Sequence, residues 1–531
     1  MGITSIRGSI EVPYLCFKSV SLRSAMIHKL LVFFLIFCFL IGTSCSDSEH
    51  KKGKALFDTH CANCHSAPDI QDLPKFLWKG KVLPEMGARM GVRDSAYDPY
   101  EGYTFEEQYA MIQSGVYTVT PAISKEDWQR LVDYVVSNAP DSLPHLDVPR
   151  TTKSITQFSV IPVDIDSTAG SLITYAEFDS ENDILVTADI RGNVFGYNAV
   201  ERKLTKRYAL GNPVTAFDET DTTAYIATVG ILDPSEISLG SVTIAHNGSG
   251  LRLPFEFHRP VHILAHDFNG NGDTEIVVSE FGNLTGQVSL LVKTKDSVFE
   301  KRTLLNRPGA VRAIARDMDG NGKDDIVVMT AQGDEGISIL YQSGDLDFKS
   351  EQPIRFSPLY GSSWFELLDY DGDGDQDILT VHGDNGDKTK ILKPYHGVRI
   401  HLNDGSNHFS EAFFYPFYGA TRSVSRDFDQ DGDIDIALIS TFPDYGSRPV
   451  QSFVFLENTN SSKFSFEPLG LPKGLSGRWF LMDAGDVDSD GDEDLILTCF
   501  TYSFTPLPRD LARTWQKSDF DVVILENRLL D

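Results

Sequence analysis

Cysteine is scarce in this sequence, with six in 531 residues. Cys16, Cys38 and Cys45 lie near the amino terminus, Cys61 and Cys64 are three residues apart, and Cys499 stands alone. Small secreted folds that rely on disulfides show an even set of regularly spaced cysteines. The sequence gives no such framework. Its length leaves room for at least two domains with a large apolar core.

Long apolar runs are also rare. Residues 30–41 form a twelve-residue apolar run, which is too short for a membrane-spanning helix. A short basic start before it and small residues before Cys45 complete a secretory signal. The ending resembles a bacterial lipoprotein signal, although Gly42 replaces the usual leucine. The resemblance implies a lipidated Cys45, a signal segment over residues 1–44 and an extracytoplasmic, lipid-anchored protein, periplasmic or on the cell surface. Simple secretion is the alternative, and the signal fits best if translation starts at Met26.

Basic residues are outnumbered, with 47 Lys and Arg against 76 Asp and Glu, so the formal net charge is −29. Nucleic-acid binding depends on cationic surfaces, so we do not expect a nucleic-acid partner. Five short loops hold 23 of the acidic residues. The negative charge therefore reflects these loops and says little about partners.

Motifs of several common enzyme classes are missing as well. No Ser-His-Asp order, phosphate-binding loop or dinucleotide fingerprint stands out. His382, His396 and His401 are too loosely related in sequence to predict a metal site. We therefore lean against an enzyme and predict no catalytic residue.

The sequence does contain one strong cofactor motif, Cys-Ala-Asn-Cys-His at residues 61–65. This is the attachment pattern of a c-type haem. Cys61 and Cys64 would form thioethers to the haem vinyl groups, and His65 would bind the iron. A zinc site would need a second pair of ligands, and no second cysteine pair follows. We predict one covalent haem c.

The flanking sequence supports this prediction. Residues 53–57 (Gly-Lys-Ala-Leu-Phe) resemble the amino-terminal helix of class I cytochromes c. Ser124 and Asp127 form a start like a capping box, and the helix after it has Trp128, Leu131, Val132 and Val135 on one face. We therefore expect a small all-α cytochrome c domain over residues 53–140.

Three methionines could supply the sixth iron ligand. Met86 and Met90 are four residues apart, on one side of a helix if the segment is helical. Met111 lies in a separate predicted helix that begins at the capping box Thr104–Glu107. We favour Met86 and keep Met90 and Met111 as alternatives. Histidine–methionine ligation leaves no open iron position and is typical of electron transfer.

The five acidic loops share one design of nine residues, with oxygen ligands at positions one, three, five and nine and a backbone carbonyl at seven. Such a set suits calcium. An EF-hand also needs a glutamate at position twelve and a following helix. Position twelve here is Val278, Val328, Thr380, Leu438 or Leu497, and each loop leads into a strand-like segment. These loops are not EF-hands.

The loops recur at a regular spacing. Their first aspartates are residues 267, 317, 369, 427 and 486, which are 50 to 59 residues apart. Degenerate units at residues 178–185 and 217–221 precede them. That period is typical of four-stranded propeller blades. We predict a linker over residues 141–154 and a seven-bladed β-propeller over residues 155–531. A strand near residues 159–161 would pair with the last blade and close the ring.

The loops resemble those of FG-GAP/VCBS repeats in integrin-type propellers. The resemblance is strong in the last five units and implies up to five calcium ions. By that resemblance, the ligands are Asp267, Asn269, Asn271, Asp273 and Glu275; Asp317, Asp319, Asn321, Lys323 and Asp325; Asp369, Asp371, Asp373, Asp375 and Asp377; Asp427, Asp429, Asp431, Asp433 and Asp435; and Asp486, Asp488, Asp490, Asp492 and Asp494. Position seven contributes its carbonyl.

The first loop has the fewest charged ligands, and affinity follows ligand charge. We expect this site to lose its ion first.

The next turn of each blade lies on the opposite face of the propeller. There the last three blades carry long connections rich in aromatic, His and Arg residues, at residues 382–396, 442–449 and 500–515. Such loops are a usual place for binding.

The whole chain resembles bacterial proteins with a cytochrome c domain ahead of VCBS repeats. That resemblance supplies neither a substrate nor a redox partner. We expect electron transfer through the haem, with the calcium-stabilised propeller as a docking or recognition platform. Two alternatives stay open: a propeller that oxidises a substrate and passes electrons to the haem, and an adhesion or glycan-binding module.

Overall fold

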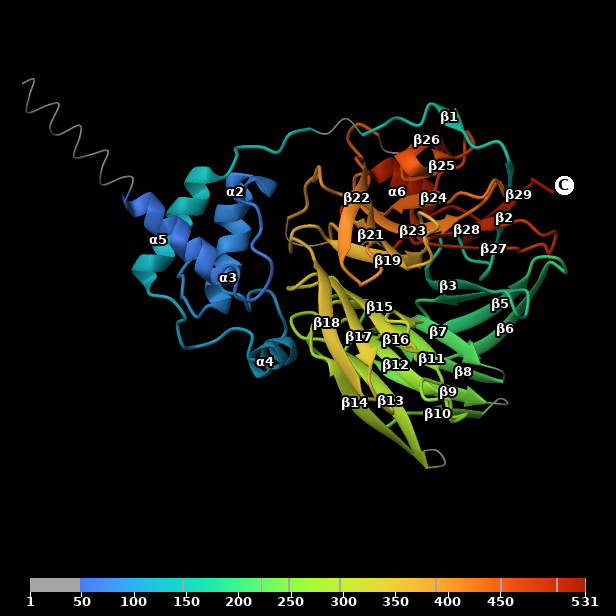
Figure 1. Cartoon of the computed structure of the whole chain (residues 1–531), viewed down its shortest axis with the longest axis horizontal. Helices are drawn as coiled ribbons and strands as arrows, with labels where there is room; N and C mark the ends of the chain where they lie inside the picture. The colour runs from blue at the N-terminus through green and yellow to red at the C-terminus, as the bar shows by residue number, and fades with distance from the viewer. Residues whose placement is uncertain are drawn as a thin grey trace, which may run out of the picture.

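A computed structural model describes residues 48–145, 148–220, 222–246, 249–295, 298–386, 389–448, 451–502 and 505–530. It contains a small helical unit, in blue shades in Figure 1, and a larger ring of β-sheets. This confirms the predicted fold class. The predicted signal segment and Cys45 lie outside the described residues, as does Asp221. Among the residues described, no helix has the length and apolar composition needed to cross a bilayer.

The helical unit starts with a helix over residues 48–60 and ends with α5. The elements that follow the first helix are η1 Ile70–Asp72, α2 Lys75–Leu77, η2 Trp78–Val82, α3 Leu83–Arg89, α4 Phe105–Gln113 and α5 Lys125–Asn138. Both predicted caps form. Thr104 and Glu107 make a reciprocal capping box on α4, and the Ser124 hydroxyl accepts from the backbone N–H of Asp127 at 3.1 Å. These bonds satisfy donors that a helix start leaves unpaired.

Gly53 sets how closely the first helix approaches α5. A Cβ at Gly53 would lie 2.5 Å from the Cβ of Tyr134 and 2.9 Å from the carbonyl oxygen of Arg130. Only a residue without a side chain allows this contact. Next to the crossing, Leu131 and Val135 of α5 are fully buried in the core of the unit. The two terminal helices therefore pack directly against each other.

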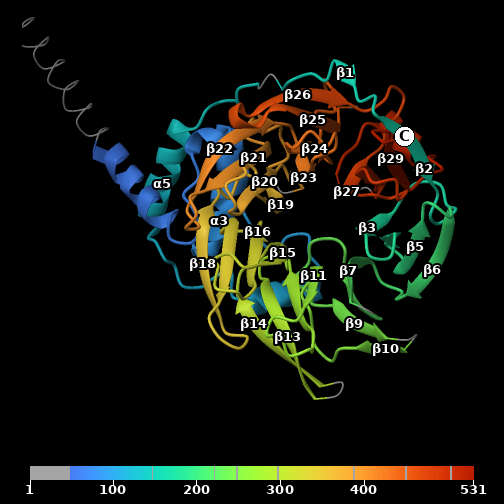
Figure 2. The same ribbon diagram turned by 45° about the vertical axis from the view of Figure 1, so that its right-hand side comes forward.

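Seven sheets form the ring, as Figure 2 shows. Blades 1 to 3 contain β3 Ile173–Asp179, β4 Ile184–Asp189, β5 Asn193–Asn198 and β6 Lys203–Ala209; β7 Val214–Thr220, β8 Thr223–Thr228, β9 Ser241–His246 and β10 Ser249–Arg252; and β11 Pro260–His266, β12 Glu275–Glu280, β13 Gln287–Lys295 and β14 Val298–Leu305. Blades 4 and 5 contain β15 Ala310–Arg316, β16 Asp325–Thr330, β17 Gly336–Gln342 and β18 Phe348–Arg355; and β19 Ser362–Leu368, β20 Asp377–His382, β21 Gly397–Asn403 and β22 Phe409–Pro416.

Blades 6 and 7 both use strands from the start of the domain. Blade 6 contains β23 Ala420–Arg426, β24 Asp435–Ser440, β25 Phe453–Asn460 and β26 Ser465–Gly470, and β1 Lys153–Ser154 adds parallel to β26. Blade 7 contains β27 Trp479–Gly485, β28 Asp494–Cys499 and β29 Val522–Asn527, with β2 Phe158–Val163 as its outer strand. The antiparallel pairing of β2 with β29 is the predicted closure.

Aromatic packing anchors the closing strand. The ring of Phe158 lies edge-on to Phe428 and Phe455, with centroids 6.0 and 5.8 Å away. All three side chains are buried in one cluster with the β28 and β29 side chains Leu495, Leu497, Val523 and Leu525. The closure thus combines a hydrogen-bonded ladder with a shared apolar core.

The innermost strand of every blade carries an irregularity near its start. The pairing register shifts at equivalent points in all seven inner strands, for example between Ala310 and Arg312 in β15. Such bulges twist a strand and re-aim its side chains. One residue per blade at this level lines the axis of the propeller, and we call this set the axial ring: Tyr175, Ala216, His262, Arg312, Trp364, Arg422 and Leu481.

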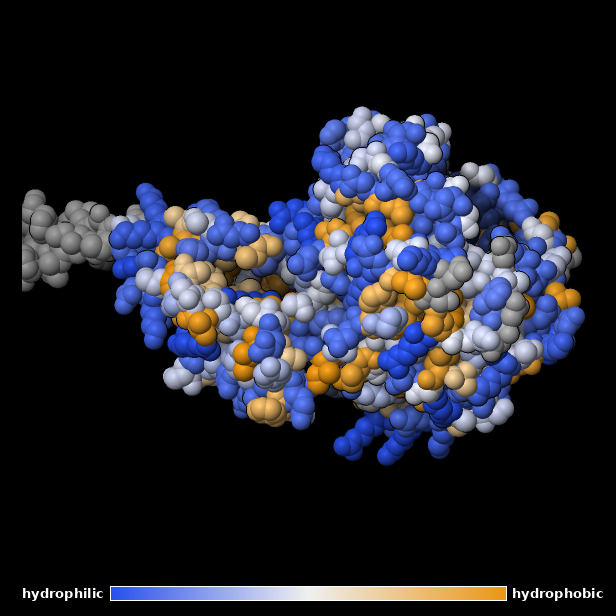
Figure 3. Space-filling view, turned by 90° about the horizontal axis from the view of Figure 1, so that it is seen from below, coloured by the Kyte–Doolittle hydropathy of each residue, from blue (hydrophilic) through white to orange (hydrophobic). Residues whose placement is uncertain are grey.

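The helical unit sits on one face of the propeller (Figures 1 and 3). Leu359 and Tyr395 belong to the same apolar cluster as the core of the helical unit, and the Tyr395 hydroxyl donates to the carbonyl of Asp72 at 3.1 Å. Leu284 packs beside Met111. These propeller residues come from the connections β18–β19, β20–β21 and β12–β13. The acidic loops join inner strands to second strands, so the helical unit covers the opposite face.

The predicted linker, residues 141–154, is partly held by the propeller. Val148 is buried in a cluster between blades 5 and 6, and the side-chain amide of Gln451 donates to the carbonyl of Pro149 at 2.9 Å. β1 then pairs with blade 6. The sequence did not reveal this strand, because two polar residues carry no apolar pattern.

The close helix crossing at Gly53 predicts that alanine substitutions at two glycines change the stability of the helical unit differently. Gly53→Ala should destabilise the helical unit by about 1–3 kcal/mol, because the new methyl group overpacks the contact with Tyr134. Gly80→Ala is the matched control: no atom lies within 4 Å of its Cβ, so it should be neutral or stabilise by about 0.4–1 kcal/mol. Denaturant unfolding followed by near-ultraviolet circular dichroism measures both. Equal stabilities of the two variants would contradict the crossing.

Candidate haem centre and acidic loops

The predicted haem-attachment residues directly follow the first helix. The backbone N–H of Cys61 still bonds to the carbonyl of Phe57 at 3.0 Å, and residues 61–65 then form a turn. Cys61 is partly buried and Cys64 is exposed, both as free thiols. Burial, with a smaller contribution from Asp58, raises the pKa of the Cys61 thiol to about 11.

The geometry of His65 fits an iron ligand. Its Nδ1 lies 2.8 Å from the carbonyl oxygen of Ser66. A carbonyl oxygen only accepts, so Nδ1 carries the proton and the lone pair is on Nε2. A hydrogen bond of this kind orients metal-binding histidines and sets their tautomer. Nε2 of His65 is therefore the atom available for iron.

A cavity of ≈ 1590 Å³ opens beside these residues. Its wall near the helical unit includes Cys61, Cys64 and His65, together with apolar side chains such as Leu77 and Trp78. Apolar lining with a few placed polar groups is typical of cofactor sites. The residues present thus fit a haem group at this end of the cavity.

All three candidate methionines touch the cavity, but their surroundings differ. Met90 packs against the core of the helical unit, and Met111 is buried in a cluster with Ala88 and Tyr117. Met86 lies on α3 and is partly exposed at the cavity wall. Met90 and Met111 therefore have packing roles besides lining the cavity, and Met86 stays the favoured prediction for the sixth ligand.

A buried carboxylate lies beside the haem end of the cavity. Glu85, which is 8% exposed, accepts from Tyr117 at 2.7 Å and from Arg89 at 3.0 Å, and also from the Tyr97 hydroxyl. Burial and the negative charge of Glu85 raise the pKa of Tyr117 well above its usual value. Sequence reasoning missed this group, because its three partners are spread over residues 89–117 and form no motif.

The five acidic loops fold alike. The glycine at position six has a φ between +83° and +100° in every loop, a conformation that favours glycine. The first aspartate accepts from the backbone N–H of that glycine, for example Asp317 from Gly322 at 2.8 Å. The acid at position nine is buried and holds two strands together: Asp325 accepts from the backbone N–H groups of Met318 and Gln342 at 2.9 and 2.8 Å.

Four of the loops bring carboxylates together. In the loops at 317, 369, 427 and 486, oxygen atoms from three acids lie within 4.8 Å of one another. Several buried carboxylate oxygens have no hydrogen-bond partner within the described part of the chain: Asp375 Oδ1, Asp433 Oδ1, Asp435 Oδ2, Asp488 Oδ1 and Asp492 Oδ1. Buried polar atoms normally have partners. This oxygen-only set fits a hard cation.

The loop at 267 differs from the other four. Its two amides replace carboxylates at positions three and five, and the Lys293 ammonium lies 2.8 Å from Asp273 Oδ1. Asn269 donates instead to Asp345 at 2.9 Å. The ammonium already supplies positive charge here, so this loop needs an added cation least.

A sixth acidic group was not visible in the sequence. Asp164, Asp166 and Asp521 meet where the ring closes. Asp521 accepts from the backbone N–H groups of Ile165 and Asp166 at 2.8 and 3.2 Å, and Arg191 pairs with Asp166 at 3.0 Å. About 355 residues separate Asp521 from the other two, so no local pattern could predict it. The hydrogen bonds of Asp521 explain this acidic group as part of the closure of the propeller ring.

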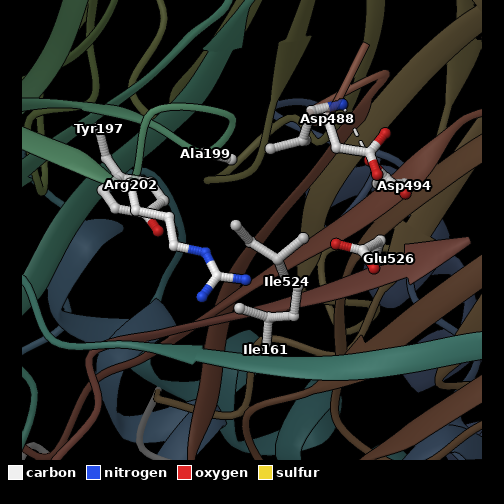
Figure 4. Close-up of a pocket in the computed structure, with 9 residues that line it drawn as sticks. Ile161, Tyr197, Ala199, Arg202, Asp488, Asp494, Ile524 and Glu526 are labelled. Carbon is white, nitrogen blue, oxygen red and sulfur yellow. Dashed lines mark hydrogen bonds between the residues drawn. The ribbon is translucent and has the colours of Figure 1, made fainter. Parts of the chain in front are cut away.

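Figure 4 shows a small cavity beside the last acidic loop. Asp488, Asp494 and Glu526 lie on one side of it, and Arg202 reaches in from blade 1. Its volume is ≈ 30 Å³, about the share of one water molecule in the liquid. It has room for a water molecule or an ion and is too small for an organic substrate.

Comparison with known proteins agrees with this division of the chain. The family model described as Cytochrome c matches residues 50–139. The model described as FG-GAP-like repeat matches residues 267–328, 317–380 and 427–497, which include all five acidic loops. The chain therefore contains a cytochrome c domain followed by FG-GAP-like repeats in a seven-bladed β-propeller.

No curated protein matches the chain. Among solved structures, the chain is similar to the β-propeller domain of Cps50 (Swd1) from Myceliophteria thermophila, at 11% identity. That similarity covers 69% of this chain and 99% of the Cps50 domain, with a TM-score of 0.41. So low a score supports no functional argument. The cytochrome c domain implies a covalently bound haem c and haem-based electron transfer.

Proposed function

We propose that this protein transfers electrons through one haem c and that its propeller is a calcium-stabilised platform for docking or recognition. The observation that carries the proposal is the orientation of His65 beside Cys61 and Cys64 at a large apolar cavity. A bound haem supplies a one-electron couple. The two thiols hold it covalently, and Nε2 of His65 binds the iron.

Met86 completes the site in this proposal. Its side chain lines the same cavity as His65 and would supply the second iron ligand. Histidine–methionine ligation would favour electron transfer over oxygen or peroxide chemistry. Residues of the propeller form the other wall of this cavity. The lipid anchor at Cys45 and the extracytoplasmic location are part of the proposal through the sequence resemblance alone.

Calcium has a structural role in the proposal. In each loop the cation would neutralise carboxylates that connect an inner strand to the second strand of its blade. The unpartnered oxygens of Asp375, Asp433 and Asp488 support binding. The loops lie on the face opposite the haem domain, so the ions stabilise the propeller without taking part in electron transfer.

Covalent attachment is tested by removing the thiols. The double variant Cys61→Ala, Cys64→Ala should lose all haem on denaturing extraction, because no thioether remains. The matched control is Cys499→Ala, which removes a buried thiol in blade 7 and should retain haem and its dithionite-reduced spectrum. Haem that stays bound to the denatured double variant would contradict the proposed attachment.

The sixth ligand is tested by comparing three methionine variants. Met86→Ala should abolish the charge-transfer band of methionine-ligated ferric haem, lower the potential and allow added imidazole to bind. Met90→Ala and Met111→Ala should keep the band and lose stability by about 2–5 kcal/mol, as large-to-small core changes do. Persistence of the band in Met86→Ala would reassign the ligand to one of the other two.

Calcium removal should destabilise the propeller, and more so at high pH. Each site contributes about 2.7 kcal/mol at a hundredfold excess over its Kd. Without a cation, burial raises the pKa of Asp435 and of Asp494 to about 7. In the unfolded chain their pKa is about 4, so the calcium-free fold loses stability as the pH rises from about 4 to about 7 and is least stable above pH 7. The fall in Tm on chelation should therefore be larger at pH 8 than at pH 6.

Loop variants give the control for this experiment. Asp267→Ala should remove the weakest phase of a calcium titration, and Asp369→Ala should remove a tight one. Lys293→Met should tighten the first site, because the competing ammonium is gone. A chelator that leaves the Tm unchanged at both pH values would refute calcium stabilisation.

A further inference from the structure

The cavity at the haem end continues to the axis of the propeller. All seven residues of the axial ring line it, as does the residue before each of them on its strand. We call this part of the cavity the vestibule. The vestibule is thus walled by every blade, whereas the haem-attachment residues wall only the opposite end.

The volume leaves room for a second molecule. Binding sites for single ligands usually measure about 300–1,000 Å³, and this cavity measures ≈ 1590 Å³. Parts of the long connections that the sequence marked as a place for binding also line it, through residues such as Lys390, Phe442 and Tyr502. The haem therefore does not account for the whole space.

Two arginines in the vestibule stack on one tryptophan. The guanidinium carbon of Arg312 lies 4.1 Å from the ring centroid of Trp364, and that of Arg422 lies 3.8 Å from it. Stacking on an aromatic ring holds a guanidinium in place and leaves its N–H edge available. Arg312 uses one N–H to donate to the carbonyl of Phe365 at 2.9 Å. The two arginines come from blades 4 and 6, on either side of the tryptophan in blade 5, and they are already in position before any ligand arrives.

Three nitrogen atoms of the axial ring are buried without a hydrogen-bond partner among the described residues: Arg422 Nε, Trp364 Nε1 and His262 Nδ1. Two of these are obligate donors. Native structures rarely leave buried donors unsatisfied, and each one left so costs about 1–3 kcal/mol. A cluster of them in a cavity predicts an acceptor that belongs to a ligand.

Carboxylates of the protein lie near the arginines, and two of them, Glu177 and Asp483, also line the cavity. Glu366 accepts from the backbone N–H of Ser425 at 3.0 Å and from the Ser423 hydroxyl, Asp483 accepts from the N–H of Phe178 at 2.7 Å, and Glu177 accepts from the Tyr175 hydroxyl. The bonds of Glu366 and Asp483 tie neighbouring blades together. The carboxylates offset the arginine charge at a distance without satisfying the N–H groups of the ring.

We propose that the vestibule binds a small organic carboxylate, held by Arg312, Arg422 and the indole N–H of Trp364 between the haem and the propeller axis. Arginine matches a carboxylate with two parallel hydrogen bonds, and the narrow axis admits a molecule but no folded partner. The site is built by the propeller, so binding does not depend on the iron ligation proposed above.

Calorimetric titration of the haem-loaded protein with benzoate, and with uncharged benzamide, tests the proposal. Benzoate should bind at one site, and benzamide should bind at least about tenfold more weakly, since hydrogen bonds to a charged group contribute about 1.5–3 kcal/mol. Arg422→Gln should weaken benzoate binding about tenfold or more. Arg426→Gln is the matched control: it lies four residues further along β23, away from the cavity wall, and should bind like the wild type.

A second variant covers the case that Arg422→Gln does not fold. Trp364→Phe keeps a six-membered aromatic ring and removes the pyrrole ring with its N–H, and it should weaken benzoate binding several-fold. Equal affinity of benzoate and benzamide, or of wild type and these variants, overturns the proposal. So does equal binding of inorganic phosphate, which marks a non-selective anion site. If benzoate gives no binding heat and Arg422→Gln alters the haem spectrum, the unpartnered donors bind the haem's own carboxylates, and the proposal is overturned. Dithionite reduction of the same samples reports separately on electron transfer.

Discussion

A ring of twisted sheets has a defined axis only when its last blade is completed by a strand from the start of the domain. Here β2 supplies that strand to β29, and Phe158 fixes it in the core of blades 6 and 7. Without this pairing, blades 1 and 7 would expose open edges. The axial ring, the vestibule and the seat of the haem domain all need the seven inner strands to face one another. They therefore depend on a contact between residues about 360 positions apart.

The two faces of the propeller carry different chemistry. One face has the acidic loops, where carboxylate oxygens gather and several lack a hydrogen-bond partner among the described residues. The other face receives the haem domain through apolar contacts such as Leu359 and Tyr395. Because each inner strand runs from the second face to the first, the strand that begins at the vestibule ends at a cation loop. A change that stabilises an acidic loop therefore also stabilises the inner strand that lines the vestibule.

Short-range patterns predicted much of this molecule. The haem motif at residues 61–65, the caps at Thr104 and Ser124 and the nine-residue loops each lie within a few positions in the chain, so their chemistry is readable from sequence. The closure could also be predicted, because a propeller must remove its edges. The axial ring could not be predicted, because its members are about 40–60 residues apart and share no single residue type, and a bulge near the start of each inner strand places them at one level. The Glu85 group and β1 were missed for the same reason, since their partners lie far apart in sequence.

The contact of residues 148 and 149 with blade 6 limits how far the haem domain can travel. Ala139 is still buried in the helical unit, the carbonyl of Pro140 accepts from the backbone N–H of Lys75, and Val148 is buried in the propeller, so the seven residues 141–147 form the leash. Fully extended, seven residues span about 25 Å. A haem domain that lifts from its seat thus stays within roughly its own diameter of the vestibule and returns at a high effective concentration. The leash thus keeps the cytochrome c domain with its own propeller.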